Sequence, residues 1–179
     1  MAVEIPLTRG YVAVVDDEDV AIIGRYAWSV AIASPTLCYA ASAVGTRKTI
    51  RRLSMHRLIM GAGVGDLVDH VDGDGLNNRR SNLRLVTRRQ HASNSRKCEG
   101  TTSKYKGVSW NINKWRARVS GRVPPCVGRY KTEIAAAYAY DQAAREIHGE
   151  FGTYNFPLPG ERSALTGLIE PWPAKAEAA

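Results

Sequence analysis

Four polar residues between positions 69 and 91 have the types and spacing needed to hydrolyse a phosphodiester bond. Asp69 and His70 are adjacent in the run LVDHV, Asn82 closes a loop rich in turn residues, and His91 follows the return segment LRLV. A carboxylate on a strand and an imidazole on the following helix can reach one divalent cation if the helix packs across the strands. His70 is then left off the metal as a candidate general base.

Each histidine and asparagine also has an ordinary structural interpretation. Asn82 alone would be a turn residue that bonds its own backbone, and His91 alone a solvated helix residue. The joint spacing favours catalysis over these separate roles. His56 fits either packing or a phosphate contact, and His148 fits a charge at a helix C-terminus or an exposed surface position.

The elements around these residues are predicted to run strand, long loop, strand, helix. LVDHV and LRLV are the strands, DGDGLNNRRSN is the loop, and RRQHASNSRK is a helix opened by a Thr87–Gln90 capping box. Upstream, YVAVV, YAWSVAIA and LCYAASAV predict strands, DDED opens a helix, and LSMHRLIMGAG forms a short one. The uncharged run 26–46 contains Pro35 and scattered polar residues, so it indicates two strands around a turn rather than a membrane helix.

Positive charge is concentrated in one part of the chain. The formal net charge is +8, but the segment from Arg79 to Lys131 holds fifteen Lys or Arg and one acid, Glu99, which gives +14 there and −6 elsewhere. A concentration of positive charge of this kind favours binding of a polyanion over a basic surface that only faces solvent, and nucleic acid is the leading partner.

Cysteine spacing and the first residues exclude several classes of protein. Cys38, Cys98 and Cys126 form no C-x-x-C or C-x-x-H pair, so neither a disulfide framework nor a zinc ribbon is indicated. The N-terminal segment MAVEIPLTRG lacks a basic leader followed by an apolar run, so we expect no secretory signal and a cytoplasmic setting.

The run DHVDGDGLNNRRSNLRLVTRRQHASN, with MHRLIMG upstream, resembles the His-Asn-His (HNH) endonucleases, in particular the phage and intron-encoded group. The resemblance implies a ββα-metal fold with His70 as the base that activates water. It implies Asp69 and His91 as metal ligands, and Asn82 as the residue that holds the loop and orients the catalytic histidine. Relatives often have Asn where this chain has His91, but imidazole is a competent ligand.

The C-terminal half contains a second pattern, independent of the first. In KWRARVS, Trp115, Ala117 and Val119 alternate with Arg116, Arg118 and Ser120, which predicts a strand with one apolar and one basic face. Two more short strands, YKGVSW and CVGRYK, flank it. The run TEIAAAYAYDQAAREIHG then predicts a helix with Thr132 as N-cap and Gly149 as stop.

The same segment, including YKGV, KWRARV, VGRY and the closing YNF, resembles the plant ethylene-response-factor (Apetala-two type) DNA-binding domain. The resemblance implies a three-stranded sheet that lies in the major groove with a helix packed behind it. Ser109 and Asn111 stand where the plant family has arginines, and the first hairpin is about one residue shorter, so plant target sequences do not transfer. The DNA-contact candidates are Lys106, Trp110, Lys114, Arg116, Arg118 and Arg129, of which Trp110 fits the core equally well.

These observations together predict an α+β chain that acts as a metal-dependent DNA endonuclease of the homing type. The alternative is a DNA-binding regulator with a catalytically inactive HNH fold. The predicted parts are a strand-rich segment (1–52), the HNH core (53–97), a linker (98–103), the Apetala-two type domain (104–158) and a tail (159–179). We expect Mg²⁺, with Mn²⁺ as the alternative, and double-stranded DNA as partner. We expect no membrane, no small-molecule cofactor and a monomer. Further DNA contacts are predicted at Arg79, Arg80 and Arg84.

Overall fold

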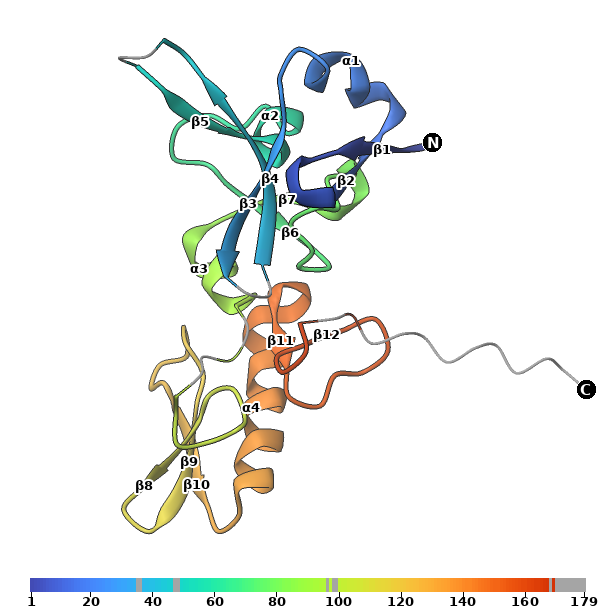
Figure 1. Ribbon diagram of the computed structural model, residues 1–179. Helices are drawn as coiled ribbons and strands as arrows, with labels where there is room; N and C mark the ends of the chain where they lie inside the picture. The colour runs from blue at the N-terminus through green and yellow to red at the C-terminus, as the bar shows by residue number, and fades with distance from the viewer. Residues whose placement is uncertain (35–36, 47–48, 96, 98–99, 168, 170–179) are drawn as a thin grey trace, which may run out of the picture. The chain divides into compact units, whose positions relative to one another are not determined.

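The computed structural model describes residues 1–34, 37–46, 49–95, 97, 100–167 and 169 (Figure 1). The chain forms two compact units, Met1–Thr87 and Arg88–Ala179, and each is described by itself. Both combine small, mainly antiparallel sheets with few helices, so the expected mixture of helix and antiparallel strand is confirmed at that level. Within the described residues, no helix is both long and apolar enough to cross a membrane.

The first unit contains three small antiparallel sheets, ordered β1-β2, β3-β4-β5 and β6-β7. The uncharged run 26–46 supplies β3 and β4, as its turn residues predict. The strands are β1 (Ala2–Pro6), β2 (Val12–Asp16), β3 (Ser29–Ser34), β4 (Leu37–Val44), β5 (Arg51–Ser54), β6 (Leu67–His70) and β7 (Leu83–Val86). The helices are α1 (Val20–Ile23), α2 (Met55–Ile59) and the 3-10 turns Thr8–Gly10, Asp17–Asp19 and Arg80–Asn82.

One apolar core holds the sheets of this unit together. Its fully buried members include Val15 from β2, Ile23 from α1 and Met55 from α2, and Leu83 of β7 reaches the same cluster. Strand β2 also bonds the long loop between β6 and β7. Val14 N donates to Leu76 O at 2.9 Å and Asn78 N donates to Val14 O at 2.7 Å. The N-terminal strands therefore brace the loop that follows Asp69 and His70.

The second unit contains a three-stranded antiparallel sheet ordered β10-β9-β8 and one long helix. Alternation along β9 sends Ala117 and Trp115 toward the helix, where small alanines allow close packing. Gly107, at φ +72, lies against Tyr140 so closely that a Cβ there would clash with the ring. The elements are α3 (Arg88–Ser93), β8 (Val108–Asn111), β9 (Lys114–Arg118), β10 (Cys126–Tyr130), α4 (Glu133–His148), a 3-10 turn (Gly149–Phe151), β11 (Thr153–Tyr154) and β12 (Arg162–Ser163).

Helix α4 begins and ends where the sequence predicts. The hydroxyl of Thr132 accepts from Ala135 N at 3.2 Å, and Gly149 follows the last helical residue with φ +49. His148 is buried rather than exposed. Its Nδ1 lies 3.0 Å from the hydroxyl of Ser93, and burial lowers its pKa, so the expectation of a charge or a surface position is wrong.

The predicted linker and tail lie partly outside the described residues, at Cys98, Glu99 and 170–179. Within the described part of the predicted tail, β12 pairs in parallel with β11. Arg145 of α4 also contacts Glu161 through two hydrogen bonds of 2.8 and 2.7 Å. Residues after 158 therefore contribute to the packing of the second unit. The domain boundaries themselves stay a prediction.

Candidate active site

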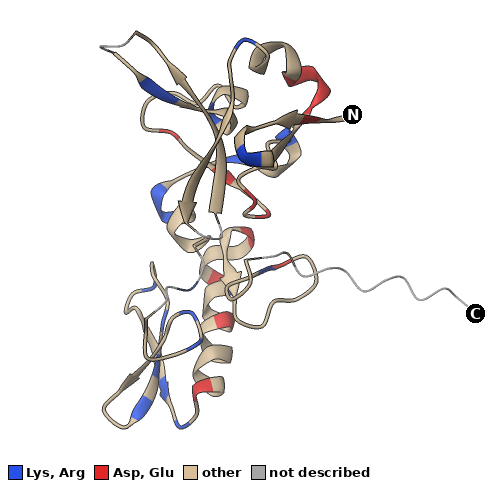
Figure 2. Ribbon diagram, viewed as in Figure 1, with Lys and Arg blue, Asp and Glu red and all other residues tan. Residues whose placement is uncertain are grey.

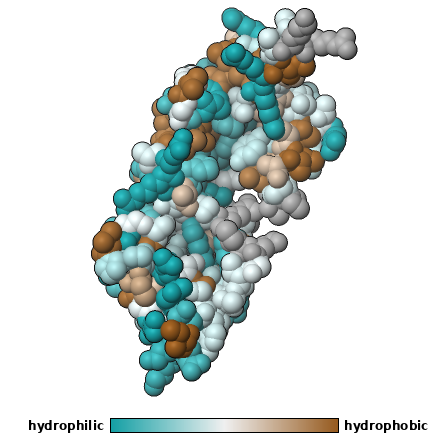
Figure 3. Space-filling model, turned by 90° about the vertical axis from the view of Figure 1, so that its left-hand side faces the viewer, coloured by the Kyte–Doolittle hydropathy of each residue, from teal (hydrophilic) through white to brown (hydrophobic). Residues whose placement is uncertain are grey.

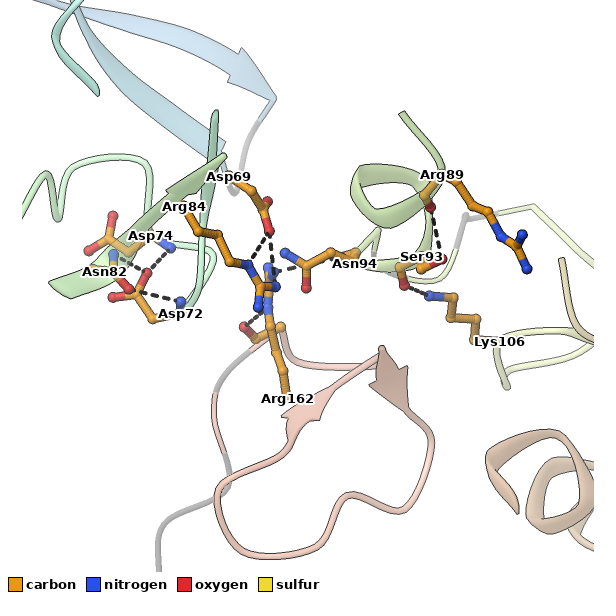
Figure 4. A network of polar contacts seen from close by, with 11 residues as sticks. Asp69, Asp72, Asp74, Asn82, Arg84, Arg89, Ser93, Asn94, Lys106 and Arg162 are labelled. Atoms are coloured by element: carbon orange, nitrogen blue, oxygen red, sulfur yellow. Dashed lines mark hydrogen bonds and ion pairs between the residues drawn. The ribbon is translucent and has the colours of Figure 1, made fainter. Parts of the chain in front are cut away.

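Asp69 and His70 end strand β6, where the β6–β7 register places them opposite Arg84 and Leu83. Both side chains are buried. Arg84 Nη2 lies 3.2 Å from Asp69 Oδ2 and Arg84 Nε lies 3.3 Å from the same oxygen (Figure 4). Arg84, predicted from the sequence to contact DNA, is thus an ion-pair partner of the predicted metal ligand.

The imidazole of His70 is held by the side chain of Asn78. The Nε2 atom of His70 lies 3.3 Å from Asn78 Oδ1, and Asn78 Nδ2 donates to Leu76 O at 3.0 Å. Because the amide nitrogen of Asn78 is committed to a carbonyl, its oxygen faces the imidazole and must accept. His70 therefore carries its proton on Nε2, and Nδ1 has a lone pair available.

Asn82 holds the loop that leads away from His70. Its Oδ1 accepts from Asp72 N at 3.0 Å, and its Nδ2 donates to Asp72 Oδ1 and Asn77 O, each at 2.8 Å (Figure 4). Asp72 also accepts from Asp74 N at 2.8 Å. The amide that contacts His70 is that of Asn78, and Asn82 acts on the loop.

Two aromatic rings flank His70 inside the unit. His56 of α2 lies edge-on to it with ring centroids 5.0 Å apart, and Tyr39 of β4 lies 5.9 Å from it and 5.5 Å from His56. A Cβ at Gly75 would clash with the Tyr39 ring, so the glycine lets the loop approach β4. Burial lowers the pKa of His70 and lowers the pKa of His56 to about 3, which keeps both rings neutral at pH 7.

Arg79 and Arg80 are paired with acids from the DDED run of the same unit. Arg80 reaches Asp19 through Nη2 at 2.7 Å and Nε at 3.0 Å, and Asp19 is buried. Asp16 accepts from Arg80 N at 2.8 Å and from Arg79 Nε at 3.3 Å, and the backbone bond lowers its pKa. Arg80 Nε also lies 3.1 Å from Glu18. A phosphate contact by these arginines would compete with internal ion pairs.

His91 belongs to α3, which is part of the second unit, and its side chain is exposed. Asp69 is described within the first unit. The described residues contain no cluster of three or more His, Cys, Asp or Glu that could hold a metal ion. The ligand pair of Asp69 and His91 stays a prediction.

The candidate DNA contacts of the second unit fall into two groups. Lys114, Arg116, Arg118 and Arg129 project from the sheet face that does not meet α4. Trp110 shares the opposite face with Trp115, at a ring separation of 5.0 Å, and is 48% exposed. Its side chain is therefore neither buried in the core nor on the basic face.

Lys106 has a different environment from the other candidates. Its ammonium donates to Ser93 O and Ser95 O at 2.7 Å each and to the hydroxyl of Thr153 at 2.6 Å, which uses all three of its protons (Figure 4). It ties the end of α3 to β11. A phosphate contact would require it to give up one of these bonds.

Three residues that contact the candidate site residues were not identified from the sequence. Asn78 lies in the NNRR run, which suggested only a phosphate-gripping loop or a polar turn. Asp16 and Asp19 lie in the acidic run that predicted a helix start. The one sequence signal that could have identified Asp16 and Asp19 is the combination of an acidic run and an arginine-rich loop, whose opposite charges can pair.

Comparisons with known proteins identify the family of this chain. The family model described as HNH endonuclease matches residues 55–93, which contain α2, β6, the loop, β7 and α3. Over 155 residues the chain is 31% identical to an uncharacterized HNH endonuclease of Acanthamoeba polyphaga mimivirus, spanning 82% of this chain and 76% of that protein. Over 94 residues it is 33% identical to Protein 3.8 of Escherichia phage T7, spanning 50% of this chain and 76% of that protein. No solved structure matches. With most of a viral HNH endonuclease covered at this identity and the matched segment carrying Asp69, His70, Asn82 and His91, the chain belongs to the HNH endonuclease family.

Proposed function

We propose that this chain is a metal-dependent DNA endonuclease of the homing type, in which His70 is the general base and the second unit binds duplex DNA. The observation that carries the proposal is the contact between His70 Nε2 and Asn78 Oδ1 at 3.3 Å. A base that removes a proton from water needs an unprotonated nitrogen aimed away from its own support. This contact leaves Nδ1 in that state.

Burial contributes to the same role. It lowers the pKa of His70, so the ring is neutral at pH 7 and able to accept a proton. The nearby carboxylates of Asp69, Asp72 and Asp74 each favour the protonated, positively charged form of the His70 ring. His70 thus takes a proton from water as the hydroxide attacks phosphorus and the bond from phosphorus to the departing 3′-oxygen breaks.

Asp69 and His91 are the residues that would hold a divalent cation. With only two protein side chains, one of them a buried carboxylate, most positions around the ion are left to water, as Mg²⁺ requires, with Mn²⁺ as the alternative. When bound, such an ion supplies positive charge that stabilises the transition state and the departing oxygen. Arg84 already neutralises one oxygen of Asp69, so it would share that carboxylate with the ion.

The basic sheet of the second unit supports a targeting role. Arg116 and Arg129 are directly opposite one another on β9 and β10, and neither has an acidic partner among the described residues. Like charges in that position destabilise a free sheet. Figure 2 shows blue Lys and Arg, and no red Asp or Glu, on the strands of this sheet. A phosphate backbone would turn this repulsion into attraction. The three strands with one packed helix also agree with the resemblance to the ethylene-response-factor domains.

The rival function is a DNA-binding regulator whose HNH fold no longer cuts. The Arg84–Asp69 ion pair favours it, because a guanidinium occupies the carboxylate that a metal would need. In either case we place the protein in the cytoplasm of a phage-infected or bacterial host cell, with the phage relative as support. We also expect a monomer.

Incubation of the purified protein with supercoiled plasmid, with and without Mg²⁺, separates the two functions. We expect nicked or linear product only with metal, and none from His70→Ala, whose affinity for duplex DNA should match the wild type. Asp69→Ala and His91→Ala should each raise the Mg²⁺ concentration needed for half-maximal rate. Full cleavage by His70→Ala, or none by the wild type in any metal, would leave the regulator as the better description.

A further inference from the structure

The tip of the β8–β9 hairpin contains a residue that is unfavourable for its backbone conformation. Asn111 pairs with Lys114, so Ile112 and Asn113 alone form the loop, and their φ angles are 45° and 58°. Two positive φ values identify a type I′ turn, which strongly prefers Asn-Gly. Asn113 suits it, but a β-branched residue at positive φ is a genuine outlier.

Packing does not explain this choice. The side chain of Ile112 is 73% exposed, and the apolar core of this unit does not include it. In the free protein Ile112 is thus both strained and hydrated, although an asparagine would suit the turn and the solvent. An uncompensated outlier of this kind points to a role outside the fold of the unit.

The strands below the tip hold it in place. Trp110 and Trp115 are directly paired across the hairpin with ring centroids 5.0 Å apart, and Trp110 N donates to the hydroxyl of Thr102 at 3.2 Å. Cross-strand aromatic pairs stabilise a hairpin. Ile112 is consequently presented on a supported turn rather than on a loose loop.

The charge beside the tip identifies its partner. Strands β8, β9 and β10 contain Lys114, Arg116, Arg118 and Arg129 and no acidic residue. Figure 3 shows hydrophobic surface among hydrophilic atoms at the lower end, which contains this hairpin and the start of α4. An exposed apolar group beside an uncompensated basic face matches the surface of a nucleic-acid duplex, which has charged phosphates outside and apolar stacked bases within.

We propose that Ile112 is an apolar wedge that enters a base-pair step of duplex DNA bound on the basic sheet. This inference rests on the proposed DNA-binding function of the second unit. Inserted apolar side chains partly unstack a step and kink the duplex. Pyrimidine–purine steps unstack most easily, so a TA or CA step is the preferred site. Because the turn is already formed, little conformational freedom is lost on insertion.

The test compares full-length wild type with Ile112→Asn, Ile112→Leu and Ile134→Asn. Ile134, on α4, is 51% exposed and receives the same chemical change outside the hairpin. Each protein is mixed, in the presence of chelator, with a duplex that carries end dyes for energy transfer and 2-aminopurine at a central TA step. Anisotropy gives the Kd, and thermal unfolding gives the Tm.

We expect Ile112→Asn to raise the Tm by about 2 to 4 °C, because turn strain is relieved. The same variant should weaken duplex binding by about tenfold, since the burial of one isoleucine is lost. It should also abolish both the bend and the 2-aminopurine signal. Ile112→Leu should keep both signals, and Ile134→Asn should behave as wild type.

Three results would overturn the wedge. An Ile112→Asn protein that bends and binds DNA as the wild type does would refute it while leaving DNA binding intact. A variant altered only in self-association, measured by light scattering, would make the tip a protein contact. A wild type that does not bind duplex DNA would refute the proposed function itself, and the wedge with it.

Discussion

Replacing Asn78 by alanine should slow cleavage without weakening DNA binding. Asn78 is fully buried and links the Nε2 proton of His70 to the carbonyl of Leu76. Its removal leaves the buried Nε2–H of His70 without its acceptor, whereas Leu76 O keeps its bond from Val14 N, so the free energy of unfolding should fall by about 1 to 3 kcal/mol. The freed imidazole can then rotate or move its proton to Nδ1.

The loss of support for the base should lower kcat by about 10- to 100-fold, a typical effect of removing a residue that orients a catalytic histidine. The matched control is Asn77→Ala. The neighbouring amide donates to Asp72 Oδ2 at 2.7 Å and does not contact His70. Single-turnover plasmid cleavage, anisotropy and chemical denaturation would be measured for both variants.

Nitrogen NMR of the imidazole reports the tautomer of His70, which would not change if Asn78 had only a structural role. In the wild type, His70 should show the Nε2-protonated tautomer, and Asn77→Ala should retain it. Asn78→Ala should show mixed tautomers. Equal kcat for the two variants, or an unchanged His70 spectrum in Asn78→Ala, would refute the assignment of Asn78 as the support of the base.

Three further predictions concern ion pairs, pH and salt. Arg80→Met should lower the free energy of unfolding by about 2 kcal/mol or more, because it strands the buried Asp19 carboxylate; unchanged urea stability with weaker DNA binding would instead make Arg80 a phosphate contact. Because the folded-state pKa of His56 is about 3 against 6.5 in the unfolded chain, the unfolded state binds more protons between those values. The free energy of unfolding should therefore fall as the pH is lowered through that window, by up to about 1.4 kcal/mol per pH unit. His56→Phe should reduce this slope in thermal unfolding at pH 7, 6 and 5. Arg116→Gln and Arg129→Gln should each reduce the slope of log affinity against log salt by about 0.9 in anisotropy titrations, and a slope equal to wild type would remove that residue from the interface.

Local periodicity was enough to predict several elements of both units. The apolar runs before and after the DGDGLNNRRSN loop form β6 and β7, and the alternation in KWRARVS places arginines on one face of β9. Helix α4 has the predicted cap at Thr132. These features depend on neighbours within a few residues, so a sequence pattern carries them. The catalytic assignment of His70 came from the spacing of a known family.

The partners of individual charged and amide groups were decided only by the tertiary structure. Arg80 and Asp19 are 61 positions apart, and Lys106 is bonded by carbonyls and a hydroxyl from two other segments. Arg80 and Lys106 look from the sequence like phosphate ligands, because the sequence does not show which acceptor a positively charged side chain contacts after folding. Asn78 supports His70 because β2 bonds the loop and turns that amide inward. A contact between distant segments exists only once both are packed, and residue types and local spacing do not encode it.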